Sequence, residues 1–234
     1  MQTALAAVGL PPALATIPQC RTPSSPVAEA KGGFRRTVPA EDEIFADGDR
    51  AGTFYKVVSG VVRTCKLLSD GRRQIDAFHL PGDIFGLEAG AEHRVNAEAV
   101  TEARLEVYRR EPRALAGDDG TLAREIVASM LKGLERAQDH MMLLGRKSAR
   151  ERIATFLITF SRRTACTGTA MELPMSRTDM ADHLGLTVES VSRAVTQLER
   201  EGLIALPPNR RMVVLRDKAA LARSPSDFGS RLVL

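Results

Sequence analysis

The sequence predicts an α+β fold in which an N-terminal antiparallel β-roll is followed by a long helix and by a C-terminal unit of short helices and a β-hairpin. Short alternating runs separated by glycine turns fill residues 34–112, an unbroken helical pattern covers residues 122–144, and two short helical patterns meet at Gly185. Hydrophobic residues make up 44% of the 234-residue chain, enough to bury real cores. We divide the chain into an arm (1–33), a β-roll (34–117), a long helix (118–146) and the C-terminal unit (147–234).

The first two segments are predicted from composition and turns. Residues 1–33 are rich in Ala, Pro and Ser, which is typical of a flexible arm. Beyond them, Asp70-Gly71 separates two runs of alternating polarity, and this dipeptide is a strong signal for a tight hairpin. Repeated strands bounded by glycine at this spacing favour a small antiparallel roll or jelly roll.

The long helix has apolar residues at alternating steps of three and four. This spacing forms a narrow seam, which is typical of a helix that pairs with a second helix in a coiled coil. The alternative is a helix packed on its own β domain, although a β-roll would favour a wider apolar stripe. We therefore predict a homodimer whose dimerisation seam consists of Leu122, Ile126, Met130, Leu134, Ala137, Met141 and Leu144.

The C-terminal unit begins with an amphipathic helix that runs to about Arg163. Its inward residues are predicted to be Ile153, Phe156, Leu157 and Phe160. A short strand near residues 171–173 precedes the two short helices. Beyond Gly202, two apolar runs flank Pro207-Pro208 as the strands of a hairpin would. Together these elements predict a winged helix-turn-helix.

The two short helices carry clear start and stop signals. Ser176 and Asp179 form a capping-box-like pair at the start of the first helix. Gly185 permits a left-handed turn at its end, and Thr187 caps the second helix. The apolar residues predicted to pack these helices together are Met180, Leu184, Leu186, Val191, Val195 and Leu198.

An exposed polar stripe is predicted at the start of the second short helix. Glu189, Ser192 and Arg193 fall opposite its apolar residues, where helix-turn-helix proteins read the major groove of DNA. The planar guanidinium of Arg193 can donate to O6 and N7 of guanine together. Glu189 can accept from N4 of cytosine and orient Arg193, and Ser192 can contact a base edge or a thymine methyl group. We predict that these residues read bases; the alternative is a solvated helix face.

Basic and hydroxyl residues near this stripe are candidates for contacts with DNA phosphates, which fix register and affinity but carry no direct sequence information. They are Arg177, Thr178, Thr187, Thr196, Arg210 and Arg211. Residues 147–234 contain 14 Lys and Arg against 9 Asp and Glu, whereas residues 1–146 contain 19 against 20. A basic C-terminal third fits a module that binds phosphates, although a chance asymmetry would look the same.

The three cysteines, Cys20, Cys65 and Cys166, are widely separated and offer neither a disulfide framework nor a paired metal motif. No apolar run reaches the ~18–20 residues needed to cross a bilayer, and the apolar start lacks the basic residues of a signal peptide. We therefore expect a cytoplasmic protein in a reducing compartment, without membrane contact. Cys166 precedes the two short helices and is either a redox-sensitive thiol or an idle one.

With these elements in this order, the chain resembles the CRP/FNR superfamily of bacterial transcription regulators over roughly residues 34–220. The most specific pieces are Glu189-Ser-Val-Ser-Arg193, the run Leu143–Ala154, and Leu80-Pro-Gly-Asp-Ile-Phe-Gly86. The Glu-x-x-Ser-Arg pattern is similar to the FNR/FixK branch. The resemblance implies a β-roll of the cyclic-nucleotide-binding type and a homodimeric activator on a TTGAT-N4-ATCAA palindrome of double-stranded DNA. It also implies recruitment of RNA polymerase, commonly for genes of low-oxygen and nitrogen metabolism.

The chain also departs from the ligand-binding members of that family. Its arm contains only Cys20, so a four-cysteine iron–sulfur cluster cannot be built within one chain. Members of that family that bind cyclic AMP use an acid for the ribose and an Arg-Ser or Arg-Thr pair for the phosphate after the Gly-Asp turn. Here Gly86 is followed by Leu87-Glu88, and Arg94 by Val95-Asn96. Arg94 is then a surface arginine or a separate anion site. We expect no cofactor and no bound metal.

An enzyme is not expected, because the chain shows no Gly-rich phosphate loop, nucleophile elbow, His-Glu metal motif or Cys-His arrangement. Two roles for the β-roll stay open beside that of an inherited scaffold. In the first, the β-roll binds a small molecule or haem and thereby gates DNA binding. In the second, the β-roll is a module that binds another protein.

Overall fold

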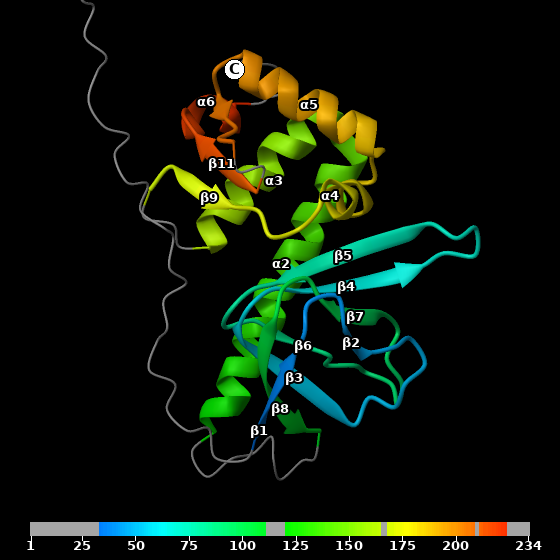
Figure 1. The fold of residues 1–234 in the computed structure, drawn as a ribbon. Coiled ribbons are helices and arrows are strands. Elements are labelled where there is room, and N and C mark those ends of the chain that lie inside the picture. Colours follow the sequence, from blue (N-terminus) through cyan, green and yellow to red (C-terminus); the bar gives the residue numbers. More distant parts are fainter. Residues whose placement is uncertain (1–32, 111–119, 165–167, 209–210, 224–234) are drawn as a thin grey trace, which may run out of the picture.

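The computed structural model describes residues 33–110, 120–164, 168–208 and 211–223, which form a β-roll and a helical unit connected by one long helix (Figure 1). The predicted α+β fold is confirmed. Cys166, Arg210 and all but one residue of the predicted arm lie outside the described residues. Within those residues, every helix is too short or too polar to cross a membrane.

Short strands build the β-roll as two antiparallel sheets of four strands each, with the orders β1-β8-β3-β6 and β2-β7-β4-β5. The strands are β1 (Phe34–Val38), β2 (Glu43–Phe45), β3 (Thr53–Ser59), β4 (Val62–Leu67), β5 (Arg73–His79), β6 (Ile84–Phe85), β7 (Asn96–Ala99) and β8 (Ala103–Arg109). Between the sheets lies an apolar core that includes Phe45, Tyr55 and Leu105. The predicted antiparallel roll is thus confirmed.

The β4–β5 hairpin turns at the predicted Asp70-Gly71. Gly71 has a φ of 83°, which residues with a side chain rarely adopt, and Asp70 accepts a hydrogen bond from the backbone N–H of Arg72 at 3.0 Å. The two strands pair from Val62 opposite His79 outward to the turn. In space the hairpin lies beneath α4 of the helical unit (Figure 1). It is therefore one part of the β-roll that contacts the C-terminal unit, and Asp83, which bonds to Arg163 of α3 at 2.6 Å, is another.

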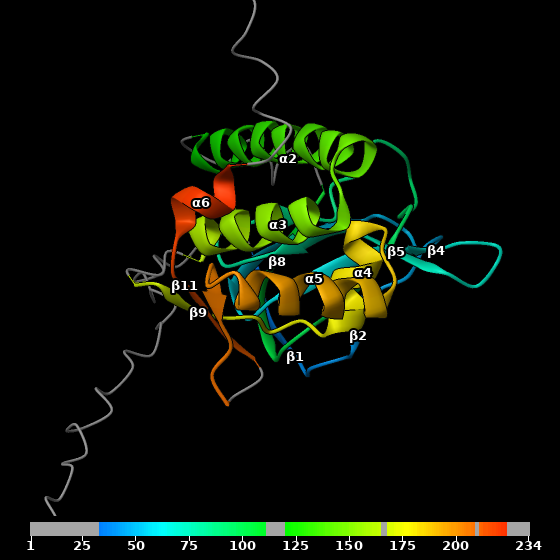
Figure 2. The same ribbon diagram turned by 90° about the horizontal axis from the view of Figure 1, so that it is seen from above.

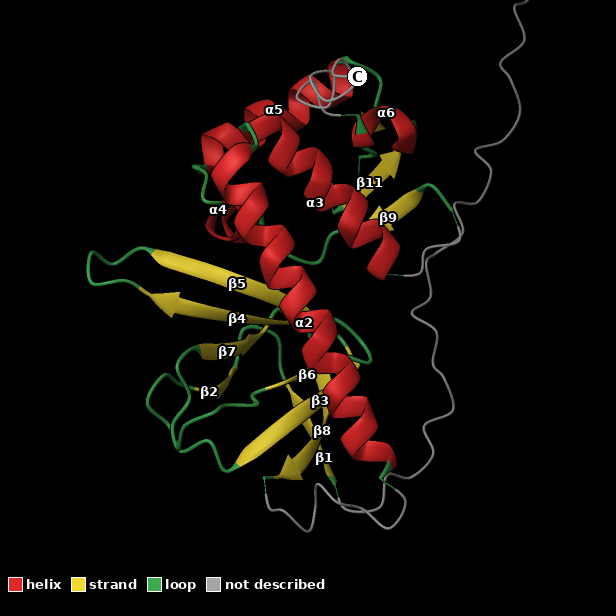
Figure 3. Cartoon of the chain, turned by 180° about the vertical axis from the view of Figure 1, so that it is seen from behind, coloured by secondary structure: helices red, strands yellow, loops and turns green. Residues whose placement is uncertain are grey.

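The long helix α2 (Thr121–Arg146) runs along the β-roll and continues to the helical unit (Figure 3). Near its start, Ile126 is buried against Phe54, Ile84 and Tyr108 of the roll. Near its end, Leu143 is buried in the core of the helical unit. The helix therefore connects the two units through its own side chains.

The predicted dimerisation seam stays a prediction, although the residues at its ends also pack within their own chain. Leu122 and Ile126 pack on the β-roll of their own chain, and Leu144 packs against the core of the helical unit, so these three side chains are occupied within one chain. A helix can present two apolar stripes on different faces, and the spacing of three and four does not separate them. The large apolar residues that α2 leaves exposed are Val127, Met130, Leu131, Leu134, Met141 and Met142. Ala137 is also exposed.

The C-terminal unit is a winged helix-turn-helix. Its elements are α3 (Ala149–Arg163), β9 (Ala170–Glu172), α4 (Arg177–Leu184), α5 (Val188–Arg200), β10 (Ile204–Ala205), β11 (Met212–Leu215) and α6 (Lys218–Ala222). The three strands form an antiparallel sheet in the order β10-β11-β9. α3 lies between α2 and α5 (Figure 2) and buries the residues predicted to face inward, Ile153, Phe156, Leu157 and Phe160.

One apolar core joins the β-roll to the helical unit. Ile75 of β5 belongs to the same buried cluster as Ile153 of α3 and Leu198 of α5. Arg152 of α3 strengthens the junction because its guanidinium donates to the carbonyls of Leu144 in α2, at 2.8 Å, and of Leu184 in α4, at 2.9 Å. The side chain of Arg152 thus connects three helices at a partly buried point.

Two histidines pack side by side at this junction. The rings of His140 in α2 and His183 in α4 stack with centroids 4.3 Å apart, and Phe78 and Phe156 meet the His183 ring edge-on. Nδ1 of His183 lies 3.0 Å from the carbonyl oxygen of Ile75, to which it donates. Burial, followed by repulsion from His140, lowers the pKa of His183 to about 4. Both rings are therefore neutral at physiological pH.

We predict that stability falls as the pH drops below about 6.5, because the unfolded chain binds the His183 proton before the folded chain does. The loss should reach at most about 1.4 kcal/mol per pH unit from this group and should end near pH 4, where the folded His183 also titrates. Urea unfolding between pH 7.5 and 5 measures it. His183→Asn, which keeps a donor for Ile75, should show a shallower pH dependence, and an unchanged slope would contradict the assignment.

Candidate nucleic-acid interface

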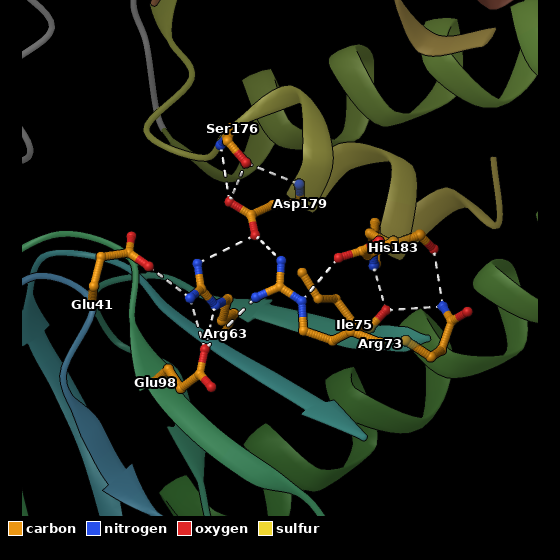
Figure 4. Close-up of polar contacts among 10 residues, drawn as sticks. Glu41, Arg63, Arg73, Ile75, Glu98, Ser176, Asp179 and His183 are labelled. Carbon is orange, nitrogen blue, oxygen red and sulfur yellow. Dashed lines mark hydrogen bonds and ion pairs between the residues drawn. The ribbon is translucent and has the colours of Figure 1, made fainter. Parts of the chain in front are cut away.

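The helix-turn-helix starts from a fully formed capping box. The Ser176 hydroxyl accepts from the backbone N–H of Asp179 at 3.0 Å, and the Asp179 carboxylate accepts from the N–H and hydroxyl of Ser176 at 3.0 and 2.8 Å (Figure 4). Gly185 ends α4 with a φ of 60°. Thr187 then caps α5 by accepting from the backbone N–H of Ser190 at 3.2 Å. These four predicted signals are confirmed.

Helix α5 is strongly two-sided. Its apolar face, with Val191, Ala194, Val195 and Leu198, is buried against α3 and α4. Of the other predicted packing residues, Met180 and Leu184 are buried, and Leu186 is partly buried against the same core. Because this face is fixed in the core, the opposite face of α5 points outward.

The outward face carries the residues predicted to read bases. Glu189, Ser192 and Arg193 are all exposed, as is Thr196 one turn further on. Hydrogen bonds from its own backbone N–H and from the Thr187 side chain, together with the charge of Arg193, lower the pKa of Glu189. Glu189 is therefore ionised and can only accept hydrogen bonds, whereas Arg193 can only donate them. The pair presents complementary hydrogen-bonding groups on one helical turn.

The described candidates for phosphate contacts lie on α4, at the cap and on the outward face of α5, and just before β11. Arg177 is half-buried in the first turn of α4; burial lowers its pKa and the charge of Glu199 opposes this shift. Thr178 is exposed beside it, and Thr187 is exposed while its hydroxyl caps α5. Arg211 is exposed immediately before β11. Their contact with DNA stays a prediction.

A groove of about 1110 Å³ runs between the outward face of α5, the wing and the β-roll. Ser192 and Thr196 line it from α5, and Arg177 lines it from α4. Pro207 and Pro208 of the predicted wing also line the groove, and so do Glu41, Arg63 and Arg73 of the β-roll, which the sequence did not indicate. No local pattern connects these distant segments; only the packing of the two units brings them together.

The β-roll offers little to a charged ligand at the positions singled out by sequence. The carboxylate of Glu88 accepts from the backbone N–H and from Nε of Arg94 at 3.3 and 3.4 Å, and the Arg94 side chain is 85% exposed. Burial raises the pKa of the Cys65 thiol to about 11, which keeps it protonated. Among the described residues, no group of three His, Cys, Asp or Glu side chains could hold a metal ion.

The fold and the outward face of α5 define a winged helix-turn-helix regulator that binds DNA and carries a β-roll of the cyclic-nucleotide-binding type. Two family models match the chain: a cyclic nucleotide-binding domain over residues 35–116 and a Crp-like helix-turn-helix domain over residues 151–224. The residues around Glu88 and Arg94 do not fit a cyclic nucleotide, because the arginine is exposed and bound to that carboxylate.

Known relatives give the family. The nitrogen fixation regulation protein FixK of Azorhizobium caulinodans is 53% identical over 189 residues, which cover 79% of this chain and 76% of the relative. FixK of Rhizobium meliloti is 46% identical, with 76% and 81% covered. The structure of FixK2 from Bradyrhizobium japonicum superposes with a TM-score of 0.74 at 47% identity, covering 81% of this chain and 95% of that one. The chain belongs to the CRP/FNR family of transcription regulators and is FixK-like; it is not an enzyme.

We predict that Arg193→Ala weakens binding to a TTGAT-N4-ATCAA duplex by about 1–3 kcal/mol per half-site and relaxes selectivity at the guanine, because the bidentate contact is lost. Titration of labelled duplexes with and without the guanine replaced measures both effects. Arg200→Ala, which removes the same charge from the exposed last turn of α5, serves as the control and should keep the selectivity. If Arg193→Ala loses the same affinity for the duplex with the guanine and for the duplex without it, Arg193 does not read that base.

Proposed function

We propose that the protein binds as a homodimer to a TTGAT-N4-ATCAA palindrome and activates transcription by recruiting RNA polymerase. The observation that carries this proposal is the exposed Glu189, Ser192 and Arg193 stripe at the start of a helix whose other face is buried. Because relatives are named as regulators of nitrogen fixation, we place its target genes in nitrogen and low-oxygen metabolism.

The geometry of α5 supports the proposed reading of bases. Its N-terminal turns enter the major groove, where Arg193 donates to O6 and N7 of guanine and Glu189 accepts from N4 of a cytosine. Ser192 contacts a neighbouring base edge or methyl group. Arg177, Thr178, Thr187, Thr196, Arg210 and Arg211 contact the phosphates and hold α5 at its depth and register.

Dimerisation supplies the second half-site. The side chains of Met130, Leu134 and Met141 on α2 are 57–66% exposed, and Val127, Leu131 and Met142 widen the same apolar stripe. Such a run is unfavourable in water and is typical of a helix that pairs with its own copy. Two α5 helices would then lie about 34 Å apart on one face of the DNA, which matches a palindrome.

The proposal is tested by a salt titration of the purified protein, with no ligand added, on the palindromic duplex and on a scrambled one. Selective binding that weakens steeply with salt is expected, because each half-site adds phosphate contacts. Weak and equal binding to both duplexes would overturn the proposal that the protein binds its DNA site without a ligand. It would favour a regulator in which a ligand or haem in the β-roll gates DNA binding.

We predict that Leu134→Glu, which places a charge in the exposed apolar stripe of α2, converts the dimer to a monomer and abolishes tight binding to the palindrome. Lys132→Glu, an exposed position on the same helix, is the matched control and should leave the dimer intact. Sedimentation velocity measures the mass, and circular dichroism reports whether the monomer stays folded. A dimeric Leu134→Glu variant would move the interface elsewhere.

A further inference from the structure

A buried arginine of the β-roll bonds to the helix-turn-helix. The side chain of Arg63 in β4 is only 6% exposed, and its guanidinium contacts three carboxylates (Figure 4). Glu98 and Glu41, both from the β-roll, lie at 2.7 Å, and Asp179 of α4 lies at 3.2 Å. A guanidinium is buried at low cost only when such partners are in place.

A second arginine repeats the connection. Arg73, at the start of β5, reaches Asp179 of α4 at 2.6 Å (Figure 4). It also reaches Asp182 of α4 at 2.8 Å. Beside it, the carbonyl of Ile75 accepts from Nδ1 of His183 at 3.0 Å. The β4–β5 hairpin therefore holds one side of α4 along most of its length. We refer to Arg63, Arg73, Asp179 and Asp182 as the latch.

Asp179 has two functions in this arrangement. One carboxylate oxygen, Oδ2, accepts from Ser176 and caps α4, while the other, Oδ1, accepts from Arg63 and Arg73. Burial disfavours its charge, but the Ser176 hydrogen bonds and the two arginines outweigh that effect and lower its pKa. The same charge that starts the helix thus attaches it to the β-roll.

We propose that the latch is a positioning device that fixes the distance between the two half-sites that the dimer accepts. α2, which we propose sets the dimer axis, packs on the β-roll, whereas α5, which we propose reads DNA, packs on α4. The latch connects the β-roll to α4 and therefore lies between α2 and α5 in this chain of contacts. Successive base pairs are only about 3.4 Å apart along the helix axis, so a small tilt of α4 moves α5 by a whole base pair. This inference rests on the proposed homodimeric DNA binding.

A positioning role differs from a stabilising one. Buried ion pairs contribute little net stability compared with apolar replacements, but they can specify one arrangement against close alternatives. Loss of a latch contact should therefore widen the range of spacings that are bound, whereas simple destabilisation would lower the active fraction and weaken binding to all spacings equally. Spacing selectivity separates the two.

The test compares affinities for TTGAT-Nn-ATCAA duplexes with n of 3, 4 and 5 in the full-length protein. Arg73→Gln removes two latch contacts and leaves the capping box intact. Arg72→Gln is the matched control. Arg72 is the neighbour of Arg73 in the sequence, but among the described residues its guanidinium bonds only to Asp70 of the same turn. Ile158→Val, a small truncation in the buried core of α3, controls for lost stability.

We expect wild type and both controls to prefer the N4 duplex by about tenfold or more, since a misplaced half-site loses its base contacts. Arg73→Gln should reduce that preference to within about threefold while keeping the dimer and the preference for TTGAT over a scrambled duplex. An unchanged preference, or an equal loss on all three spacings, overturns the latch. If Arg73→Gln does not fold, it is replaced by Asp182→Asn, because the Asp182 carboxylate bonds to the same guanidinium of Arg73.

The two proposals fail in different ways. If wild type binds the three palindromes no better than a scrambled duplex, the proposed function itself is overturned, and the latch proposal falls with it. If wild type is selective and spacing-sensitive but Arg73→Gln and Asp182→Asn behave like Arg72→Gln, only the latch proposal is overturned.

Discussion

The burial of one apolar face of α5 determines how the C-terminal unit presents itself to solvent. Val191, Val195 and Leu198 are almost fully buried against α3 and α4, and removing such side chains from water stabilises a fold by roughly 1.5–3 kcal/mol each. With that face fixed, Glu189 and Arg193 have no orientation except outward. Packing of the hydrophobic core therefore fixes the orientation of the polar stripe, and this orientation is already present in the protein without DNA.

The same core extends into the β-roll, so the two units behave as one body at the junction. Ile75 of β5 and Leu157 of α3 belong to one buried cluster, while Arg152 connects the ends of α2 and α4 through their carbonyls. Arg63 and Asp179, two buried charges at this junction, are matched to each other. The β-roll of this chain thus acts on α4 directly, by packing and ion pairs.

Local signals were sufficient for much of this structure. The Ser176–Asp179 capping box and the face of α5 follow from residue types at fixed spacing, because their partners lie within a few positions. Which apolar side chains of α2 stay exposed was only partly predicted, because Ile126 faces the β-roll while its neighbour Val127 is exposed, and both fit a helical apolar pattern. The contact of Arg63 with Asp179 spans 116 positions, and no sequence pattern marks such a pair.

Hydroxyl-radical footprinting on a promoter-length duplex containing one TTGAT-N4-ATCAA site tests the central claim most directly, because it reports the backbone that the protein covers, base pair by base pair. A dimer with two outward-facing α5 helices should protect two short segments on one face of the DNA, about one helical turn apart and symmetric about the centre of the palindrome. A single protected segment, or uniform protection without that symmetry, would contradict the account.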